Sequence, residues 1–409
     1  MKEYAKCIAC QQKASQNDIM VCKKNLERML QTPQMSFFLF GPRGTGKTTW
    51  LRKNFPDAHR IDLLDEALYQ SLLSDIGLFA QQLRAREPGS WVVVDEVQRI
   101  PSLLNEVHRF MEDRKLRFVL CGSSARKLKQ SGTNLLAGRA LRRFMHPFLP
   151  EELGTRFDLK EVLTFGSLPV IWTAPDKKGA LEAYVMMYLK EEIKAEAIVR
   201  NLPAFSRFFP LAALFHGQVL NISGLSRDAG VSRTTAAGYV EILEDTLLAF
   251  RLPAYRANLR VREQKHPKLY WVDPGLVRAV QKQHGPPSPQ EKGPLFEGWI
   301  ASALRAYRDY QELFDDFFYW APAGRSRVEV DFLLKRADSF VAIEVKSGVT
   351  VRKQSLGGLR AMAKMPGVVR RICVYTGPED RVTADGVQIL TVRSFFELLE
   401  SGRVFDTVA

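Results

Sequence analysis

The sequence GPRGTGKT, from Gly41 to Thr48, constrains the fold of this chain more than any other segment. Its glycines let successive backbone N–H groups wrap the phosphates of a nucleotide. Such a loop needs a strand before it and, after it, a helix whose N-terminus faces the phosphates. Residues 37–40 and 48–53 have the composition of that strand and that helix. The segment therefore predicts a Walker A loop in a parallel α/β sheet, with ATP as the ligand.

The chemistry of the nucleotide site depends on a few side chains. In a Walker A loop the lysine reaches the β and γ phosphate oxygens, and the next hydroxyl holds Mg²⁺. A buried run, 91–94, ends in Asp95 and Glu96 at the edge of the sheet where ligands bind. We expect Asp95 to hold Mg²⁺ together with Thr48, and Glu96 to orient and deprotonate the attacking water. The predicted nucleotide ligands are Gly41, Pro42, Arg43, Gly44, Thr45, Gly46, Lys47, Thr48, Thr49 and Asp95.

The charge of the chain indicates its class of partner. The 59 Lys and Arg against 45 Asp and Glu give a net charge of +14. This excess favours an anionic macromolecule, and we expect DNA rather than a membrane. No apolar run approaches the length of a membrane span, and the first residues lack the apolar core of a signal peptide. The sequence therefore predicts a cytoplasmic protein, with two or three domains because 409 residues exceed one ordinary core.

The five cysteines do not predict a disulfide framework. Cys7 and Cys10 form a CxxC pair with Cys22 nearby and no close His, which is an incomplete set of zinc ligands. Two interpretations stay open for these three residues, a metal site or reduced thiols. Cys121 and Cys373 lie in apolar runs, and we expect them to be small core residues.

A further strand, 116–122, ends in Ser123. The order of the Walker A loop, the strand with Asp95 and Glu96, and this strand resembles the AAA-type ATPases. The resemblance implies that Ser123 senses the γ-phosphate, with Ser124 as a near rival for that role; a serine that caps the next helix is the alternative. Residues 136–139, LAGR, match a short motif of one group of these ATPases, which implies an arginine finger at Arg139. Because a neighbouring subunit often supplies such an arginine, we expect a homo-oligomer.

Residues 222–252 predict a helix-turn-helix. A short helix is followed by a turn at Gly230 and a longer helix that opens at Ser232, with an apolar tail that could begin a wing strand. The longer helix would place its N-terminal turn in the major groove of DNA. A packing module is the alternative, because such units often serve that purpose in large ATPases. The predicted DNA contacts are Ser232, Arg233, Thr234, Thr235 and Arg256.

Three short segments near the C-terminus predict a second site. A helix-borne Glu297, a strand Asp331 and the pair Glu344 and Lys346 on the next strand match the PD-(D/E)xK nuclease pattern. Carboxylates that converge on Mg²⁺ or Mn²⁺ can polarise a phosphodiester and generate a nucleophilic water. We expect Glu297, Asp331 and Glu344 to bind the metal and Lys346 to act on the water. An ordinary half-exposed strand is the alternative.

The combination of GPRGTGKT, VVVDEVQRIPSLL, CGSSAR, LAGR, YWVDPGL, FEGWIASAL, VEVDFLL and AIEVKSG is similar to prokaryotic AAA-type ATPases that carry a C-terminal domain of unknown function. The resemblance implies an α/β, multi-domain protein: a P-loop AAA+ parallel sheet with a helical lid, a winged helix-turn-helix, and a restriction-endonuclease-like α/β domain. The expected parts are an N-terminal helical lead at 1–34, the ATP-binding core at 35–150, the lid at 151–202, the winged helix-turn-helix at 203–265, a linker at 266–294, and the nuclease-like domain at 295–409.

Three functions are compatible with these expectations. The first is an ATPase that couples hydrolysis to DNA binding and processing, with metal-dependent cleavage by the C-terminal domain. The second is an ATP-switched DNA-binding regulator or scaffold with an inactive nuclease-like domain. The third is a signalling ATPase whose partner is a protein. Stimulation of hydrolysis by DNA separates the first two from the third, and metal-dependent nicking separates the first from the second.

Overall fold

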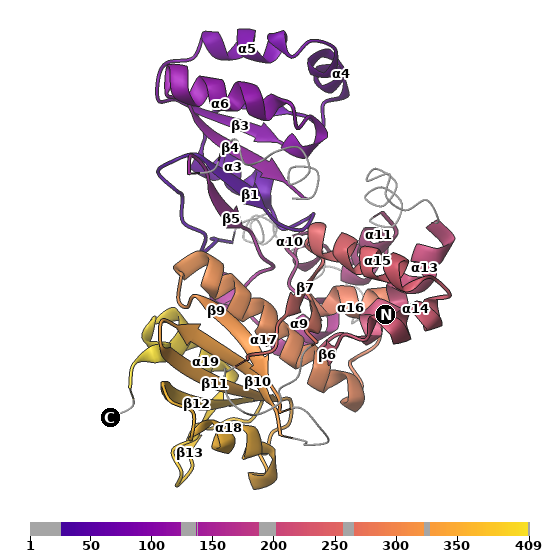
Figure 1. The fold of residues 1–409 in the computed structure, drawn as a ribbon, viewed down its shortest axis with the longest axis vertical. Coiled ribbons are helices and arrows are strands. Elements are labelled where there is room, and N and C mark those ends of the chain that lie inside the picture. The colour runs from indigo at the N-terminus through magenta and orange to yellow at the C-terminus, as the bar shows by residue number, and fades with distance from the viewer. Residues whose placement is uncertain are drawn as a thin grey trace, which may run out of the picture.

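The computed structural model describes residues 26–123, 136, 138–187, 202–256, 266–322 and 328–407. The predictions for Cys7, Cys10 and Cys22, for most of the N-terminal lead and for residues 188–201 of the lid concern residues outside this description. Figure 1 shows the first sheet and its helices at one end of the molecule, a mainly helical part in the middle, and a second sheet at the other end. The long helix α17 (Pro289–Gln311) lies between these parts.

The first sheet has five parallel strands in the order β2-β3-β4-β1-β5. Strand β4 lies between β1 and β3, so Ser123, which follows β4, is next to the ends of both Walker strands. This arrangement confirms the predicted parallel α/β sheet. The bounds are β1 (Phe37–Phe40), β2 (His59–Asp62), β3 (Trp91–Asp95), β4 (Arg117–Gly122) and β5 (Leu141–Phe144).

Both faces of this sheet are buried, because alternate residues of its strands point to opposite sides. Phe37 and Leu39 of β1 belong to the core that includes α3, and Phe38 and Phe40 belong to the core that includes α5 and α6. This burial on both faces explains the continuous apolar runs in β1 and β3. The helices are α3 (Lys47–Asn54), α4 (Glu66–Ser74), α5 (Gly77–Arg84) and α6 (Leu103–Arg114).

The middle part begins with short helices and continues with a helix-turn-helix geometry. Gly230 adopts a left-handed conformation (φ 65°) between α14 and α15, and the Ser232 side chain accepts from the backbone N–H of Thr235 (3.0 Å). Strands β6, β8 and β7 form an antiparallel sheet in that order. The bounds are α8 (Pro150–Leu153), α9 (Leu159–Phe165), α10 (Pro169–Trp172), α11 (Lys177–Met187), α13 (Leu202–Leu214), β6 (Gln218–Val219), α14 (Ile222–Ala229), α15 (Arg233–Asp245), β7 (Ala249–Leu252), β8 (Lys268–Trp271) and α16 (Pro274–Val280).

The stretch 266–294, expected to be a linker, differs from that expectation. It contains β8, α16 and the first turn of α17, and β8 is buried along its whole length. The apolar residues of KLYWV and of PGLVRAV account for this burial. Helix α17 starts at a capping box in which Ser288 and Glu291 satisfy each other's backbone N–H groups. The Pro and Gly residues at 285–289 mark only the short turn before α17.

The C-terminal part is a six-stranded sheet in the order β13-β14-β12-β11-β10-β9. Strands β9, β10 and β11 are antiparallel neighbours, whereas β12 pairs in parallel with both β11 and β14. Helix α17 precedes β9, and α18 connects β11 to β12. The bounds are β9 (Asp316–Trp320), β10 (Val330–Arg336), β11 (Ser339–Lys346), α18 (Gly357–Met362), β12 (Val368–Tyr375), β13 (Arg381–Val382), β14 (Gln388–Thr391) and α19 (Val392–Glu400).

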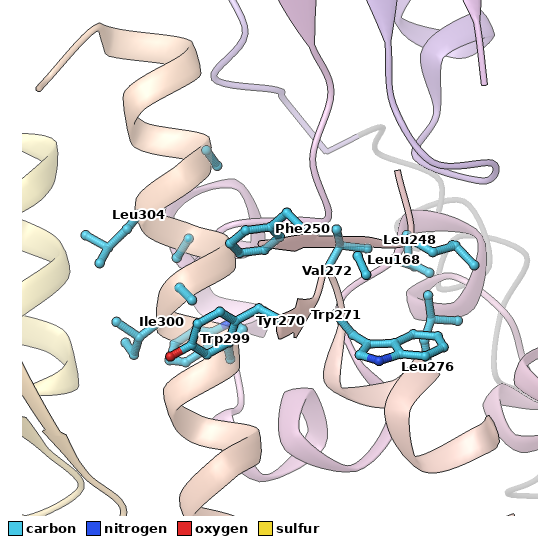
Figure 2. Packing of buried hydrophobic residues seen from close by; sticks show 14 of the residues in the cluster. Leu168, Leu248, Phe250, Tyr270, Trp271, Val272, Leu276, Trp299, Ile300 and Leu304 are labelled. Carbon is cyan, nitrogen blue, oxygen red and sulfur yellow. The ribbon is translucent and has the colours of Figure 1, made fainter. Parts of the chain in front are cut away.

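Helix α17 packs against the middle part through large side chains. Figure 2 shows Trp299, Ile300 and Leu304 of α17 in the same buried cluster as Phe250 of β7 and Tyr270 of β8. That cluster also includes residues of the C-terminal sheet such as Ile343, so α17 is buried between the two parts. Cys121 and Cys373 are buried free thiols, as predicted. Among the described residues, no helix combines the length and the apolarity that crossing a membrane requires.

Candidate functional site

The Walker A loop has the backbone that its glycines predict. Gly44 (φ 77°) and Gly46 (φ 85°) adopt left-handed conformations, which side chains rarely allow. A Cβ on Gly44 would also lie 2.4 Å from Cγ1 of Val170 on α10, so the loop packs closely on the lid. Lys47 is buried, and its Nζ donates to the carbonyl oxygens of Gly41 (2.7 Å) and Pro42 (3.1 Å).

The two predicted Mg²⁺ ligands lie in contact. The Thr48 hydroxyl, in the first turn of α3, donates to Oδ2 of Asp95 at the end of β3 (2.8 Å). Strand pairing and the Walker loop thus bring together two residues that are 47 positions apart. A hydroxyl and a carboxylate at this distance are hard oxygen donors that suit Mg²⁺.

Glu96 and Ser123 also lie together. The Ser123 hydroxyl is 3.3 Å from Oε2 of Glu96, and the Gln98 amide donates to the same carboxylate oxygen. Glu96 has a positive φ of 56°, a conformation that is costly for a non-glycine residue and is found preferentially at functional sites. The predicted general base and the predicted γ-phosphate sensor therefore share one hydrogen-bonded group.

A cavity of about 1150 Å³ adjoins the Walker loop. Its volume is sufficient for a nucleotide, since ligand pockets commonly measure roughly 300–1,000 Å³. The lining combines the loop and Glu96 with Phe148, Val170, Arg28 and Arg156. Tyr184 of α11 donates its hydroxyl to the carbonyl of Arg43 in the loop (3.0 Å). The helices α10 and α11, from the predicted lid, thus contact the nucleotide loop directly.

Arg28 links the Walker loop to the rest of the molecule. Its guanidinium donates to the Thr45 carbonyl (3.0 Å), to Oε1 of Glu152 (3.0 Å) and to the hydroxyl of Tyr310 on α17 (3.1 Å). Both partners of the Arg28–Glu152 ion pair are buried. The Tyr310 hydroxyl in turn accepts from the backbone N–H of His146 (2.9 Å). We call the set Arg28, Glu152, His146 and Tyr310 the interdomain clamp.

Arg139 forms an ion pair with a helix of the first sheet's layer. Its side chain is about half exposed and pairs with Glu112 of α6 (2.6 Å). Among the described residues, the lining of the nucleotide cavity does not include it. The role of an arginine finger for a neighbouring subunit stays a prediction.

The predicted DNA contacts differ in exposure. Ser232, Arg233 and Thr234 at the start of α15 are exposed, and Thr235 is partly exposed. The hydroxyls of Ser232 and Thr235 lie 2.8 Å apart, and Ser232 is the N-cap of α15, so these two side chains have structural roles as well. Arg256 is also exposed. On the opposite side of α15, Ala236, Tyr239, Val240 and Leu243 are buried.

The predicted C-terminal ligands belong to one cluster of charged side chains, and a lysine from β8 lies among them. Lys268 Nζ is 3.0 Å from Oε1 of Glu297 on α17 and 3.8 Å from Oδ1 of Asp331 on β10, and it also pairs with Glu329. Lys346 pairs with Oε1 of Glu344 on the same face of β11 (2.5 Å). We call these residues, together with Tyr270, the carboxylate cluster. No group of three or more His, Cys, Asp or Glu in the described residues is arranged to hold a metal ion.

Burial and charge shift the pKa values in this cluster. Burial, and then the negative charges of Glu297 and Glu344, raise the pKa of Asp331 well above its ordinary value. Burial raises the pKa of Glu344 to about 7, although Lys346 opposes the shift. Burial alone would lower the pKa of Lys268. The negative charges of Glu297, Asp331 and Glu329 outweigh this effect, so the pKa of Lys268 is raised. Lys268 lies within ion-pair distance of three carboxylates, which favour its charged form.

Several residues of both sites were not identified from the sequence. Arg28 and Arg156 line the nucleotide cavity, Gln98 contacts Glu96, and Lys268 lies in the carboxylate cluster. Lys268 carries the clearest signal in retrospect, because a lysine opens the otherwise apolar strand KLYW. A buried lysine in such a strand requires an acidic partner.

Comparisons with known proteins divide the chain into three matched regions. Residues 34–154 match the model of an AAA domain. Residues 156–286 and 292–395 each match a domain of unknown function, DUF8612 and DUF4143 respectively. Uncharacterized proteins of Mycobacterium tuberculosis (Rv2008c) and Mycobacterium bovis (Mb2031c) are each 26% identical over 389 residues, which cover 88% of this chain and 82% of theirs.

The likeness to solved structures is weak. The Orc1 protein of Aeropyrum pernix, in complex with DNA, has a TM-score of 0.27 and 12% identity, covering 62% of this chain and 87% of that one. Protein VC1899 of Vibrio cholerae has a TM-score of 0.25 and 12% identity, covering 91% and 98% of the two chains. Scores at this level support no conclusion about function. The match of residues 34–154 to the model of an AAA domain agrees with the Walker geometry of the same residues and supports a P-loop ATPase domain there.

Proposed function

We propose that this chain is a DNA-associated AAA+ ATPase that hydrolyses ATP and couples hydrolysis to the binding and processing of DNA. The observation that carries the ATPase activity is the contact of Thr48 with Asp95, beside Glu96, at the edge of the AAA sheet. Release of phosphate from ATP by the purified chain, with Mg²⁺ and with EDTA, tests the activity.

Each residue of the nucleotide site has a defined role in the proposed reaction. The backbone N–H groups of the loop and Lys47 bind the phosphates, and Thr48 and Asp95 would hold Mg²⁺, which neutralises phosphate charge when bound. Glu96 accepts a proton from a water molecule as that water forms a bond to the γ-phosphorus. The bond from the γ-phosphorus to ADP breaks in the same displacement. The Ser123 hydroxyl, which contacts Glu96, is suited to respond to the γ-phosphate.

The DNA part of the proposal is supported by charge and by α15. The chain carries a net charge of +14, and the exposed N-terminal turn of α15 presents Arg233 beside two hydroxyl residues. The sheet β6-β8-β7 around this helix pair is compatible with a winged helix. We also propose that copies of this chain assemble through Arg139 and that the protein is located in the cytoplasm.

The Arg233→Ala variant should bind duplex DNA more weakly and with a smaller dependence on salt. One phosphate contact fewer lowers the slope of log K against log salt by about 0.9, because fewer counterions are released. Fluorescence anisotropy between low and moderate salt measures that slope. The matched control is Arg393→Ala on α19, which removes the same charge from an exposed ion pair with Glu397. If the double variant at Arg233 and Arg256 binds DNA as the wild type does, α15 is a packing element.

A second function, an ATP-switched DNA-binding regulator or scaffold with an inactive nuclease-like domain, is favoured by one observation. Lys268 pairs with Glu297 and Asp331, two of the three carboxylates that metal-dependent cleavage would need. The order α17, β9–β11, α18, β12 is compatible with a nuclease-like fold. The carboxylate cluster, however, already contains the ammonium groups of Lys268 and Lys346. Incubation with linear, nicked, forked and four-way DNA, with Mg²⁺ or Mn²⁺, discriminates the two: nicking supports processing by cleavage, and intact DNA supports the regulator or scaffold.

A further inference from the structure

The carboxylate cluster contains a cation that the protein itself supplies. Lys268 is almost fully buried, and it lies on β8, which belongs to the middle part of the chain, outside the C-terminal sheet. Its three carboxylate partners come from α17, from the residue before β10, and from β10 itself. The ammonium therefore joins the middle part to the C-terminal part at the position where the predicted metal ligands converge.

One carboxylate oxygen of each predicted ligand already accepts a hydrogen bond. Oε1 of Glu297 accepts from Lys268 (3.0 Å) and from the Tyr270 hydroxyl (2.5 Å). Oδ2 of Asp331 accepts from the backbone N–H of Val345 (2.8 Å), and its Oδ1 faces Lys268. Oε1 of Glu344 accepts from Lys346. Among the described residues of the cluster, the buried oxygen without a hydrogen-bond partner is Oε2 of Glu344.

This arrangement does not fit a divalent cation. Mg²⁺ and Ca²⁺ require several oxygens at roughly 2.0–2.6 Å, whereas here one oxygen of each predicted ligand already accepts a hydrogen bond from a lysine or from the backbone. An ammonium within hydrogen-bond distance of Glu297 would also repel a second cation bound to the same carboxylates. The ammonium provides what a buried acidic group needs, namely opposite charge and hydrogen-bond donors.

We propose that Lys268 takes the place of the metal ion in the carboxylate cluster, so that the C-terminal domain is held to the middle part by an internal ammonium and binds no divalent cation. The cluster is then a fixed structural junction, and the C-terminal domain does not carry out metal-dependent cleavage. This inference concerns a site separate from the nucleotide site, so ATP hydrolysis can fail or succeed independently of it.

The test is the binding of Mn²⁺ to the full chain without nucleotide, measured by calorimetry and by the unfolding temperature. The wild type should show no saturable site that depends on Asp331, and Mn²⁺ should not raise its unfolding temperature. Lys268→Met removes the ammonium and nearly preserves the volume. This variant should bind one Mn²⁺ at least tenfold more tightly than the wild type, and Mn²⁺ should raise its unfolding temperature, since a ligand of the folded state stabilises it.

Two further variants complete the design. Lys268→Arg keeps the cation and should behave as the wild type. Lys268→Met combined with Asp331→Asn should lose the Mn²⁺ site again, which assigns that site to the cluster. If Lys268→Met does not fold, the double variant Lys268→Met with Glu329→Gln replaces it in the test. The second change removes one carboxylate that would otherwise lack a cationic partner. Binding of Mn²⁺ by the wild type as tight as in Lys268→Met, or no binding by a folded variant without Lys268, overturns the proposal.

Discussion

The Glu96→Gln variant should bind ATP as the wild type does and hydrolyse it roughly 10²–10⁴-fold more slowly, because an amide cannot accept the proton of the attacking water. The change preserves the size of the side chain and spares the Walker loop. A fluorescent ATP analogue measures binding, and phosphate release measures turnover. Gln98 and Ser123, which contact Glu96, can still donate to the amide oxygen, so the local structure should persist.

Lys47→Ala is the matched comparison, since it should lose ATP binding itself. Removal of the ammonium takes away the charge that faces the phosphates, whereas Glu96→Gln changes only the proton acceptor. The two variants together separate binding from chemistry. Normal turnover by Glu96→Gln would show that Glu96 is not the general base. Unchanged ATP affinity of Lys47→Ala would show that the loop does not bind the phosphates.

The Arg28→Ala variant should destabilise the molecule by about 3–5 kcal/mol, because it leaves Glu152 buried without its partner. It should also weaken ATP binding, since the Thr45 carbonyl in the Walker loop loses a donor. Denaturation by urea, followed by fluorescence, measures the first effect, and the nucleotide analogue measures the second. Both effects follow from the position of Arg28 between the loop, Glu152 and Tyr310 of α17.

Two controls distinguish the clamp from a general loss of charge. Arg109→Ala, which breaks an ion pair on the surface of α6, should change stability little. Tyr310→Phe removes the hydroxyl that contacts Arg28 and the His146 N–H but keeps the ring. It should produce a smaller loss of stability of the same kind. An Arg28→Ala protein as stable as Arg109→Ala would contradict the clamp.

The backbone of the Walker A loop and the strand before Asp95 were predictable from the sequence because the physical requirements behind them are local. Gly44 and Gly46 are required by backbone conformation, and the apolar run before Asp95 is required by a buried parallel strand. Such requirements act within a few residues and are therefore visible as motifs. The turn at Gly230 and the cap at Ser232 were predictable for the same reason.

The parts that sequence reasoning missed depend on contacts between distant segments. Arg28 meets Tyr310 across 282 positions, and Lys268 of β8 meets Glu297 of α17 across 29 positions. No periodicity encodes such encounters. The stretch 266–294 was expected to be a linker because of the Pro and Gly residues at 285–289, but the apolar runs that precede this turn form β8 and α16. The PD-(D/E)xK pattern located Glu297, Asp331 and Glu344 but gave no sign of the lysine that pairs with them.

The action of this ATPase on DNA is measured by the initial rate of phosphate release from ATP with and without duplex DNA. We expect Mg²⁺-dependent hydrolysis that DNA stimulates in the wild type and stimulates less in Arg233→Ala, with Glu96→Gln inactive under both conditions. Hydrolysis that DNA leaves unchanged at low salt would contradict the DNA part and favour a protein partner. No hydrolysis at all by a folded chain that binds ATP would contradict the ATPase itself.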